Sequence, residues 1–123
     1  MGAEMRRILL LAGMVLALAS PAAMAQSIGG DYAVEGTNLD GSSYGGTAKI
    51  VLTSETTCEI YWTTGPSTSQ GICMRNGNAF SAGYVMGEAI GLVIYQVMED
   101  GSLEGLWTIA GQPGSGTEKL TPQ

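Results

Sequence analysis

The sequence predicts an all-β domain, a small eight-stranded antiparallel up-and-down β-barrel. Three observations lead to this prediction. Short segments rich in Val, Ile, Thr, Tyr and Trp alternate with turns, no window longer than ten residues keeps a helical spacing of apolar positions without a glycine or proline, and the 19 glycines are neither clustered nor periodic. We expect strands at about residues 32–37, 44–53, 57–64, 70–75, 79–86, 90–98, 102–109 and 116–120.

The pair Asp40-Gly41 separates the first two strands. It is a strong hairpin signal, because Asp and Gly tolerate the positive φ that tight turns need. A two-residue turn there would place Tyr32 opposite the charged Lys49. One extra loop residue places Tyr32 opposite Ile50 instead, on a shared apolar face. We therefore predict a three-residue loop with a β-bulge.

Two cysteines occupy symmetric positions about the turn Gly65-Pro66, which separates the third and fourth strands. A symmetric hairpin places Cys58 directly opposite Cys73, at a Cα separation that suits a disulfide. A redox pair is the alternative, but the chain has no C-x-x-C motif and no cation beside either cysteine to lower its pKa. We predict a structural disulfide, which would add ~3 kcal/mol of stability by closing this loop.

The lengths of the two links that flank the sixth strand decide which of its faces turns inward. An extra loop residue near 87–88 would let Tyr84 meet Leu92. A two-residue turn at the Asp-Gly pair 100–101 would then place Leu92 opposite Ile109. Both choices turn the even-numbered residues of this strand toward the core.

These hairpins together give one contiguous apolar face with no Asp or Glu on it. Successive antiparallel strands with short links favour a barrel in which the last strand pairs with the first, and a two-sheet β-sandwich is the alternative. Glycines within the strands permit the sharp bends of a small barrel. The expected inner face consists of Tyr32, Val34, Ala48, Ile50, Leu52, Cys58, Ile60, Trp62, Phe80, Ala82, Tyr84, Met86, Leu92, Ile94, Leu103, Trp107 and Ile109.

The pattern DGSxxG occurs twice, at residues 40–45 and 100–105, each time after a strand that contains Tyr-x-Val. Two equivalent binding loops would explain the repeat, and so would two hairpins that use the same turn. Because this turn chemistry recurs in unrelated β-proteins, we favour the second interpretation.

Residues 1–25 have the pattern of a cleaved secretory signal peptide: two arginines, an apolar run of 12 residues, and an Ala-Met-Ala cleavage site. The run is shorter than the ~20 residues that span a bilayer, so we expect no membrane span after cleavage. We therefore expect an exported protein, periplasmic or secreted, whose residues 26–123 form one domain.

The composition excludes several classes of function. With no histidine, the chain lacks the Ser/His/Asp triad, the Cys/His pair and most zinc sites, and most of its carboxylates fall at turns or outer positions. A net charge of −6 argues against nucleic-acid binding. We expect no enzyme activity, no catalytic residues, no metal and no cofactor.

Two groups of residues are candidates for binding. Trp62 and Trp107 fall on the expected inner face, where they could line a ligand cavity or fill the core of so small a barrel; we favour a filled core. A second, apolar group points outward on the sixth and seventh strands, and a monomer rarely leaves such a patch uncovered. This patch suggests a protein partner, a homodimer, or cover by a chain terminus, and it comprises Val93, Tyr95, Val97 and Leu106.

The chain contains the strings GICMRNGNAFSAGY, GLVIYQVMEDGSLEGLW and GTEKL. These strings resemble segments of a group of small exported bacterial proteins, mostly of unknown function, some of which are labelled fibronectin-binding protein. The resemblance covers most of residues 31–120 and lies in turn and core residues, so it implies a shared fold more strongly than a shared partner. A second, architectural resemblance, which involves the string YWTTG at 61–65, is to periplasmic lysozyme inhibitors of the small eight-stranded barrel type.

Three functional hypotheses follow from these observations. We expect an exported, non-enzymatic binding module for a protein partner of unknown identity or for adhesion. One alternative is a periplasmic inhibitor of a cationic enzyme such as lysozyme, prompted by the acidic charge. The other is a barrel that holds a small apolar ligand between Trp62 and Trp107.

Overall fold

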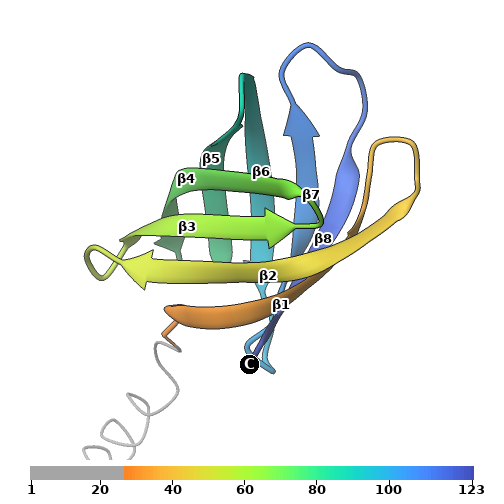
Figure 1. Ribbon diagram of the computed structural model, residues 1–123. Coiled ribbons are helices and arrows are strands. Elements are labelled where there is room, and N and C mark those ends of the chain that lie inside the picture. Colours follow the sequence, from red (N-terminus) through yellow and green to blue (C-terminus); the bar gives the residue numbers. More distant parts are fainter. Residues whose placement is uncertain (1–26) are drawn as a thin grey trace, which may run out of the picture.

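The computed structural model describes residues 27–123, which form a closed antiparallel β-barrel (Figure 1). Each strand pairs with its neighbours in sequence, and β1 pairs with β8 to close the barrel. The predicted eight-stranded up-and-down barrel is confirmed, and the β-sandwich alternative is wrong. The strands are β1 (Gly30–Thr37), β2 (Ser43–Leu52), β3 (Thr57–Thr64), β4 (Ser67–Asn76), β5 (Ala79–Met86), β6 (Ala89–Val97), β7 (Leu103–Ile109) and β8 (Gly116–Pro122).

Strand β3 illustrates why these segments extend. Its buried residues, Cys58, Ile60 and Trp62, alternate with the exposed Glu59 and Tyr61. Successive side chains of a strand point to opposite faces, so this alternation places the three buried side chains inside and the Glu59 carboxylate in water. The strand therefore has one register that buries its apolar side chains.

The hairpin between β1 and β2 has the expected three-residue loop, at residues 39–41. The loop is centred on Asp40, one residue earlier than expected. Tyr32 therefore pairs with Ala48 and not with Ile50. This difference is a shift of two residues along the partner strand, and it leaves every side chain on the predicted face.

The two DGSxxG segments form the same turn. The backbone N–H and the Oγ of Ser42 both donate to Oδ1 of Asp40, at 2.9 and 2.6 Å. Ser102 makes the same two hydrogen bonds to Asp100 at the same distances. The glycines between them have φ of 87° and 86°. The repeat is therefore explained by turn geometry.

The predicted orientation of β6 is wrong. A two-residue turn joins β5 to β6, so Tyr84 pairs with Gly91 and not with Leu92. A three-residue loop joins β6 to β7, so Leu103 pairs with Val97. Each difference is a shift of one residue, and a one-residue shift exchanges the faces of a strand. Leu92, expected inside, is 63% exposed.

Most of the other residues expected inside do lie in the interior. Ile94 is the second error on β6, and it is exposed for the same reason. Leu52 lies at the end of β2 and is also exposed. The buried hydrophobic core comprises Ile28, Tyr32, Val34, Ala48, Ile50, Cys58, Ile60, Trp62, Cys73, Phe80, Ala82, Tyr84, Val93, Tyr95, Val97, Leu103 and Leu120.

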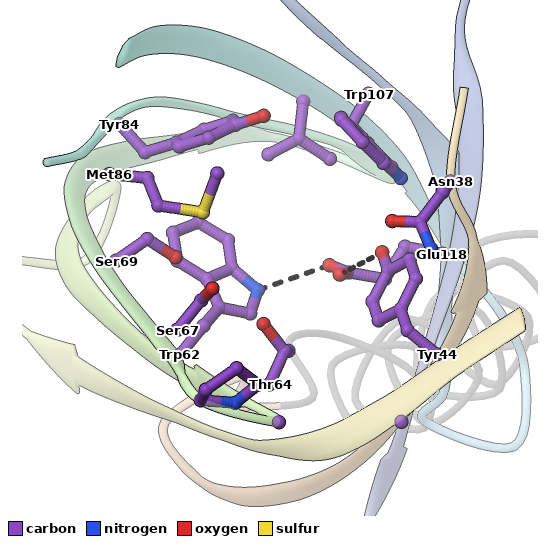
Figure 2. Close-up of a pocket in the computed structure, with 14 residues that line it drawn as sticks. Asn38, Tyr44, Trp62, Thr64, Ser67, Ser69, Tyr84, Met86, Trp107 and Glu118 are labelled. Atoms are coloured by element: carbon purple, nitrogen blue, oxygen red, sulfur yellow. Dashed lines mark hydrogen bonds between the residues drawn. The ribbon is translucent and has the colours of Figure 1, made fainter. Parts of the chain in front are cut away.

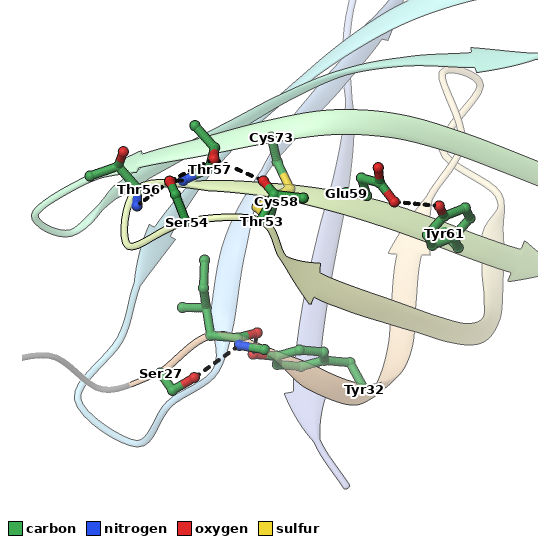
Figure 3. Close-up of a disulfide and its surroundings, with 12 residues drawn as sticks. Ser27, Tyr32, Thr53, Ser54, Thr56, Thr57, Cys58, Glu59, Tyr61 and Cys73 are labelled. Carbon is green, nitrogen blue, oxygen red and sulfur yellow. Dashed lines mark hydrogen bonds between the residues drawn. A yellow bond between two sulfur atoms is a disulfide. The ribbon is translucent and has the colours of Figure 1, made fainter.

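The predicted disulfide between Cys58 and Cys73 is confirmed, with a Cα–Cα distance of 4.9 Å (Figure 3). It lies at the end of the barrel that also receives the N-terminal segment, where the Tyr32 hydroxyl donates to the Ile28 carbonyl at 2.6 Å. The Ile28 side chain is buried and belongs to the core. We call this end the closed half of the barrel.

The expected signal peptide, residues 1–25, lies outside the described residues. Within 27–123, the structure has no helix of the length and apolar character needed to cross a membrane.

Candidate functional site

A cavity of about 390 Å³ lies at the opposite end of the barrel, which we call the open half (Figure 2). Residues of the β1–β2, β3–β4 and β5–β6 hairpins surround it, among them Asn38, Pro66 and Met86. Its volume is within the range of pockets that hold small organic molecules. Among the described residues that line it, Glu118 is the one charged side chain.

Two pairs of aromatic rings form opposite walls of this cavity (Figure 2). Trp62 packs edge-on against Tyr84 with ring centroids 5.3 Å apart. Tyr44 packs edge-on against Trp107 at 6.2 Å. Such pairs hold each other in place more firmly than their buried area alone would. The walls are therefore preformed.

Glycines on the adjacent strands make room for the second pair. A Cβ on Gly36 would lie 2.6 Å from the Tyr44 ring, and a Cβ on Gly116 would lie 2.5 Å from the Trp107 ring. Both distances are shorter than any real contact of this kind. The two glycines therefore let the rings lie directly against the strands, and the cavity keeps its width.

Three side chains donate hydrogen bonds to the carboxylate of Glu118 on β8. The Tyr44 hydroxyl donates to Oε1 at 2.7 Å, the Trp62 indole N–H donates to Oε2 at 3.1 Å, and the Tyr95 hydroxyl also donates to Oε2. These donors come from β2, β3 and β6. Glu118 is 7% exposed and joins four strands across the barrel.

The environment of Glu118 shifts several pKa values. Burial raises the pKa of Glu118, and the hydrogen bonds from Tyr95, Tyr44 and Trp62 oppose that rise. Burial, together with the negative charge of Glu118, raises the pKa of Tyr84 to about 12. The same two causes raise the pKa values of Tyr44 and Tyr95, so the three tyrosines are uncharged donors at neutral pH.

The structure places both predicted tryptophans in the cavity wall. Trp62 is buried, and Trp107 is half-buried with its indole N–H shared between the carbonyls of Thr37 and Thr117, each at 3.2 Å. These two tryptophans were expected to fill the core, but both line the cavity, and the packed core lies in the closed half, where the Phe80 ring is fully buried. The open half is hollow.

The predicted outer patch is wrong at three of its four residues. Val93, Tyr95 and Val97 are buried in the interior, because β6 has the opposite orientation to the predicted one. Tyr95 stacks on Phe80 with ring centroids 5.5 Å apart. Leu106 alone of the four is exposed, as expected.

Leu106 and six other apolar side chains cover the outside of β4–β7. They lie on neighbouring strands at positions that pair across the sheet, so they form one surface, which we call the apolar face. It consists of Ile72, Met74, Val85, Ile90, Leu92, Ile94 and Leu106.

Reasoning from sequence missed Glu118 and Tyr44. The signal for Glu118 is the alternation in the last strand: if Leu120 faces inward, Glu118 must share its face. Tyr44 lies four residues before Ala48 on the same strand. Because side chains two or four residues apart in a strand share a face, Tyr44 shares the inner face expected for Ala48. The expected inner face includes no residue of the last strand. For this reason it does not include the Glu118 carboxylate, which lies on that strand.

Within residues 27–123, no group of three or more Cys, Asp or Glu side chains is arranged to hold a metal ion. The cavity offers a single carboxylate, indole and phenol groups, and the hydroxyls of Thr64, Ser67 and Ser69 (Figure 2). This set of groups suits an organic molecule with an aromatic or aliphatic body and a polar end.

No protein-family model and no curated protein matches the chain. Several solved structures are similar to it. EF1p2_mFAP2b bound to DFHBI has a TM-score of 0.68 at 14% identity, over 78% of this chain and 94% of that chain. A redesigned β-barrel, mFAP1, bound to DFHBI has a TM-score of 0.67 at 19% identity, over 76% of this chain and 94% of that chain. A de novo designed fluorescence-activating β-barrel has a TM-score of 0.63 at 18% identity, over 77% of this chain and 93% of that chain. At these identities the likeness shows the barrel fold alone.

Proposed function

We propose that this protein is a non-catalytic binding barrel that holds a small organic molecule in the cavity of its open half. The observation that carries the proposal is the preformed cavity of about 390 Å³, with two aromatic walls and a buried carboxylate. A barrel that only had to be stable would gain by filling this space, because empty volume in a core lowers stability.

The similar barrels support this proposal as examples of what the fold can do. Two of them are described as bound to DFHBI, and a third as fluorescence-activating. They show that a barrel of this size and topology can hold a bound molecule. The identity of the molecule has to come from the lining of this chain's own cavity.

Export is the second part of the proposal. It rests on the signal-peptide pattern of residues 1–25 and on the Cys58–Cys73 disulfide, since disulfides persist mainly in oxidising compartments. The function that we propose is therefore that of an exported carrier or sensor of a small molecule. The resemblance to small exported bacterial proteins is in line with this location.

The experiment is a ligand screen with a variant that fills the cavity. Thermal shift and tryptophan fluorescence would be recorded on the oxidised protein with a panel of aromatic and aliphatic compounds, DFHBI included. Ser69→Phe places a ring in the cavity, because Ser69 lines it as the cross-strand neighbour of Trp62. Thr68→Phe adds the same ring one residue away, on the exposed side of β4, and is the matched control.

We expect compounds that stabilise the wild type and the Thr68→Phe variant to lose at least about tenfold in affinity for Ser69→Phe. Two outcomes contradict the proposal. In one, no compound changes either signal at about 1 mM. In the other, Ser69→Phe binds the active compounds as tightly as the wild type does.

Binding of a protein partner, adhesion and lysozyme inhibition have less support. The patch that motivated a protein partner is mostly buried, and the acidic charge is the one observation that favours a cationic enzyme as target. A lysozyme assay at micromolar protein would test that function directly.

A further inference from the structure

We propose that the cavity selects a cationic ligand, a small amine or ammonium compound with an aromatic or aliphatic body. This inference rests on the proposed function and names the chemical class of the ligand. It is carried by the Glu118 carboxylate together with the four rings around it.

The charges around Glu118 favour a cationic ligand. Each hydrogen bond to Glu118 comes from a neutral donor, and no Lys or Arg is among the described residues that line the cavity. Three donors stabilise the ionised form of the Glu118 carboxyl group, and none of them carries a positive charge that would compensate it. A bound cation would compensate it in a partly water-excluded site, where charges attract more strongly than in water.

The Glu118 carboxylate also has an unused acceptor position. Oε2 accepts two hydrogen bonds, from Trp62 and Tyr95, and Oε1 accepts one at normal length, from Tyr44. A carboxylate oxygen can accept two, so Oε1 has room for one more donor. Figure 2 shows this carboxylate pointing into the cavity between Tyr44 and Trp62. An N–H of a bound amine would complete the set.

The aromatic rings that line the cavity favour an organic cation as well. Cations bind favourably over the faces of Trp and Tyr rings, within ~6 Å of the ring centre. Trp62, Tyr84, Tyr44 and Trp107 surround the space in front of Glu118. Aromatic rings around a carboxylate favour an organic cation over a hydrated metal ion, because the rings replace water at the apolar part of the ligand. The overall charge of −6 attracts cations to the molecule as well.

The test compares two ligands with the same skeleton. 2-Phenylethylamine is a cation at neutral pH, and 2-phenylethanol is its uncharged counterpart with the same number of heavy atoms. Affinities of both for the oxidised protein would be measured by calorimetry and tryptophan fluorescence, together with the Glu118→Gln variant. Near-UV circular dichroism would show whether that variant keeps its aromatic packing.

We expect the wild type to bind the amine at least about tenfold more tightly than the alcohol, and Glu118→Gln to lose most of this preference. If the alcohol binds as tightly as the amine, the ligand class is wrong and the proposed function stands. The same holds if another uncharged compound binds and the amine does not. If no compound of the screen binds, the proposed function itself fails. The wild-type comparison needs no variant, so a misfolded Glu118→Gln protein does not affect it.

An independent observation, the apolar face, carries a second inference: we propose that two copies of this chain associate through it. Its side chains are 45–75% exposed and together expose on the order of 800 Å². That is about the area each partner buries in a standard protein interface, and it exceeds the roughly 300–600 Å² of the largest apolar patch on a typical monomer.

The distribution of charge favours a second copy as the occupant. The outward positions of β4, β5 and β6 carry no charged residue, whereas those of β1–β3 carry Asp31, Glu35, Lys49 and Glu59. On β7, the fourth strand of the apolar face, Glu104 is the one charged outward residue. Two acidic molecules that meet through this side keep most of their carboxylates apart and in water. A shallow hollow of about 460 Å³, lined by Ile94 and Leu106 and also by the carboxylate-bearing Glu104, gives the side chains of the second copy a place to insert.

The test is the oligomeric state. Leu92→Glu combined with Ile94→Glu places charges at the centre of the apolar face. Val51→Glu combined with Tyr61→Glu places the same charges at exposed positions of β2 and β3 and is the matched control. Sedimentation velocity and light scattering would be recorded up to about 100 µM.

We expect dimers of the wild type and of the control, and monomers of the Leu92→Glu/Ile94→Glu variant. A wild type that stays monomeric at the highest concentration overturns the proposal. In that case flotation with phosphatidylcholine vesicles would show whether a lipid surface covers the apolar face instead. Dimers of the Leu92→Glu/Ile94→Glu variant would also overturn it, since the interface would then lie elsewhere.

Discussion

Tyr84 and Gly91 face each other across the β5–β6 pair, and the tyrosine ring occupies the position that a side chain on residue 91 would take. A Cβ on Gly91 would overlap the end of this ring. The ring is in turn fixed by its contact with Trp62 and by the hydrogen bond from its hydroxyl to the Thr108 carbonyl at 3.1 Å. One glycine thus sets the position of one cavity wall.

Gly91→Ala should therefore destabilise the barrel and displace Tyr84. We expect a loss of about 1–3 kcal/mol in the free energy of unfolding, because the added methyl group overpacks a filled position. Urea unfolding measures the loss, and the near-UV spectrum should change because Tyr84 packs on Trp62.

Gly83→Ala is the control for this prediction. A Cβ there would meet only a terminal methyl group of Leu92, at 3.9 Å. We expect a change within about 0.5 kcal/mol, as for most surface substitutions. Equal effects at the two glycines would contradict the steric account.

Glu118 should make stability depend on pH in a defined direction. Burial raises its pKa in the folded protein, so the folded protein holds this proton more tightly than the unfolded chain. The stability that Glu118 contributes is therefore fully present at pH values below the pKa of a glutamate in the unfolded chain. The contribution is lost as the pH rises through the folded-state pKa.

Glu118→Gln removes this dependence. We expect the difference in unfolding free energy between wild type and variant to fall with rising pH and then to level off. Hydrogen bonds from Ser42 and Ser102 lower the pKa values of Asp40 and Asp100, which act in the opposite direction. Both proteins contain these aspartates, so their contribution cancels in the difference. A difference that is flat from about pH 4 to about pH 8 would contradict the prediction.

The disulfide should contribute stability without affecting the cavity. Cys58 and Cys73 are 15 residues apart, and closing a loop of that length is worth about 3 kcal/mol. We expect Cys58→Ala combined with Cys73→Ala to lose about that amount in urea unfolding. Because the bond lies in the closed half, ligand affinity of the folded variant should equal that of the wild type. A tenfold loss of affinity would show that the two halves are coupled.

The two repeated turns should differ in their sensitivity to mutation. Ser42 and Ser102 make the same hydrogen bonds, but Ser42 is exposed and Ser102 is 1% exposed. We expect Ser42→Ala to change the free energy of unfolding by less than about 0.5 kcal/mol. Ser102→Ala should cost about 1 kcal/mol, because a partly buried hydrogen bond is lost. Thermal unfolding of the two variants side by side tests the difference.

The comparison of β3 with β6 shows which parts of this fold are predictable. In β3 apolar and polar residues alternate, so its face, its pairing with β4 and the disulfide follow from the sequence. In β6 both faces are apolar, with Leu92 outside and Val93 inside. Alternation then carries no information. A one-residue error in the length of the β5–β6 loop reverses the strand, and a second one in the β6–β7 loop returns β7 to its expected face.

The sequence by itself determined the number and order of the strands, the hairpin that joins Cys58 to Cys73, and the inward position of both tryptophans. These features depend on local turn chemistry and on the two-residue period of a strand. Only the tertiary structure decided which apolar side of β6 is exposed, that Glu118 meets Tyr44, Trp62 and Tyr95, and that the open half is hollow. Those features depend on loop lengths and on closure of β8 against β1, which bring together residues that are distant in sequence.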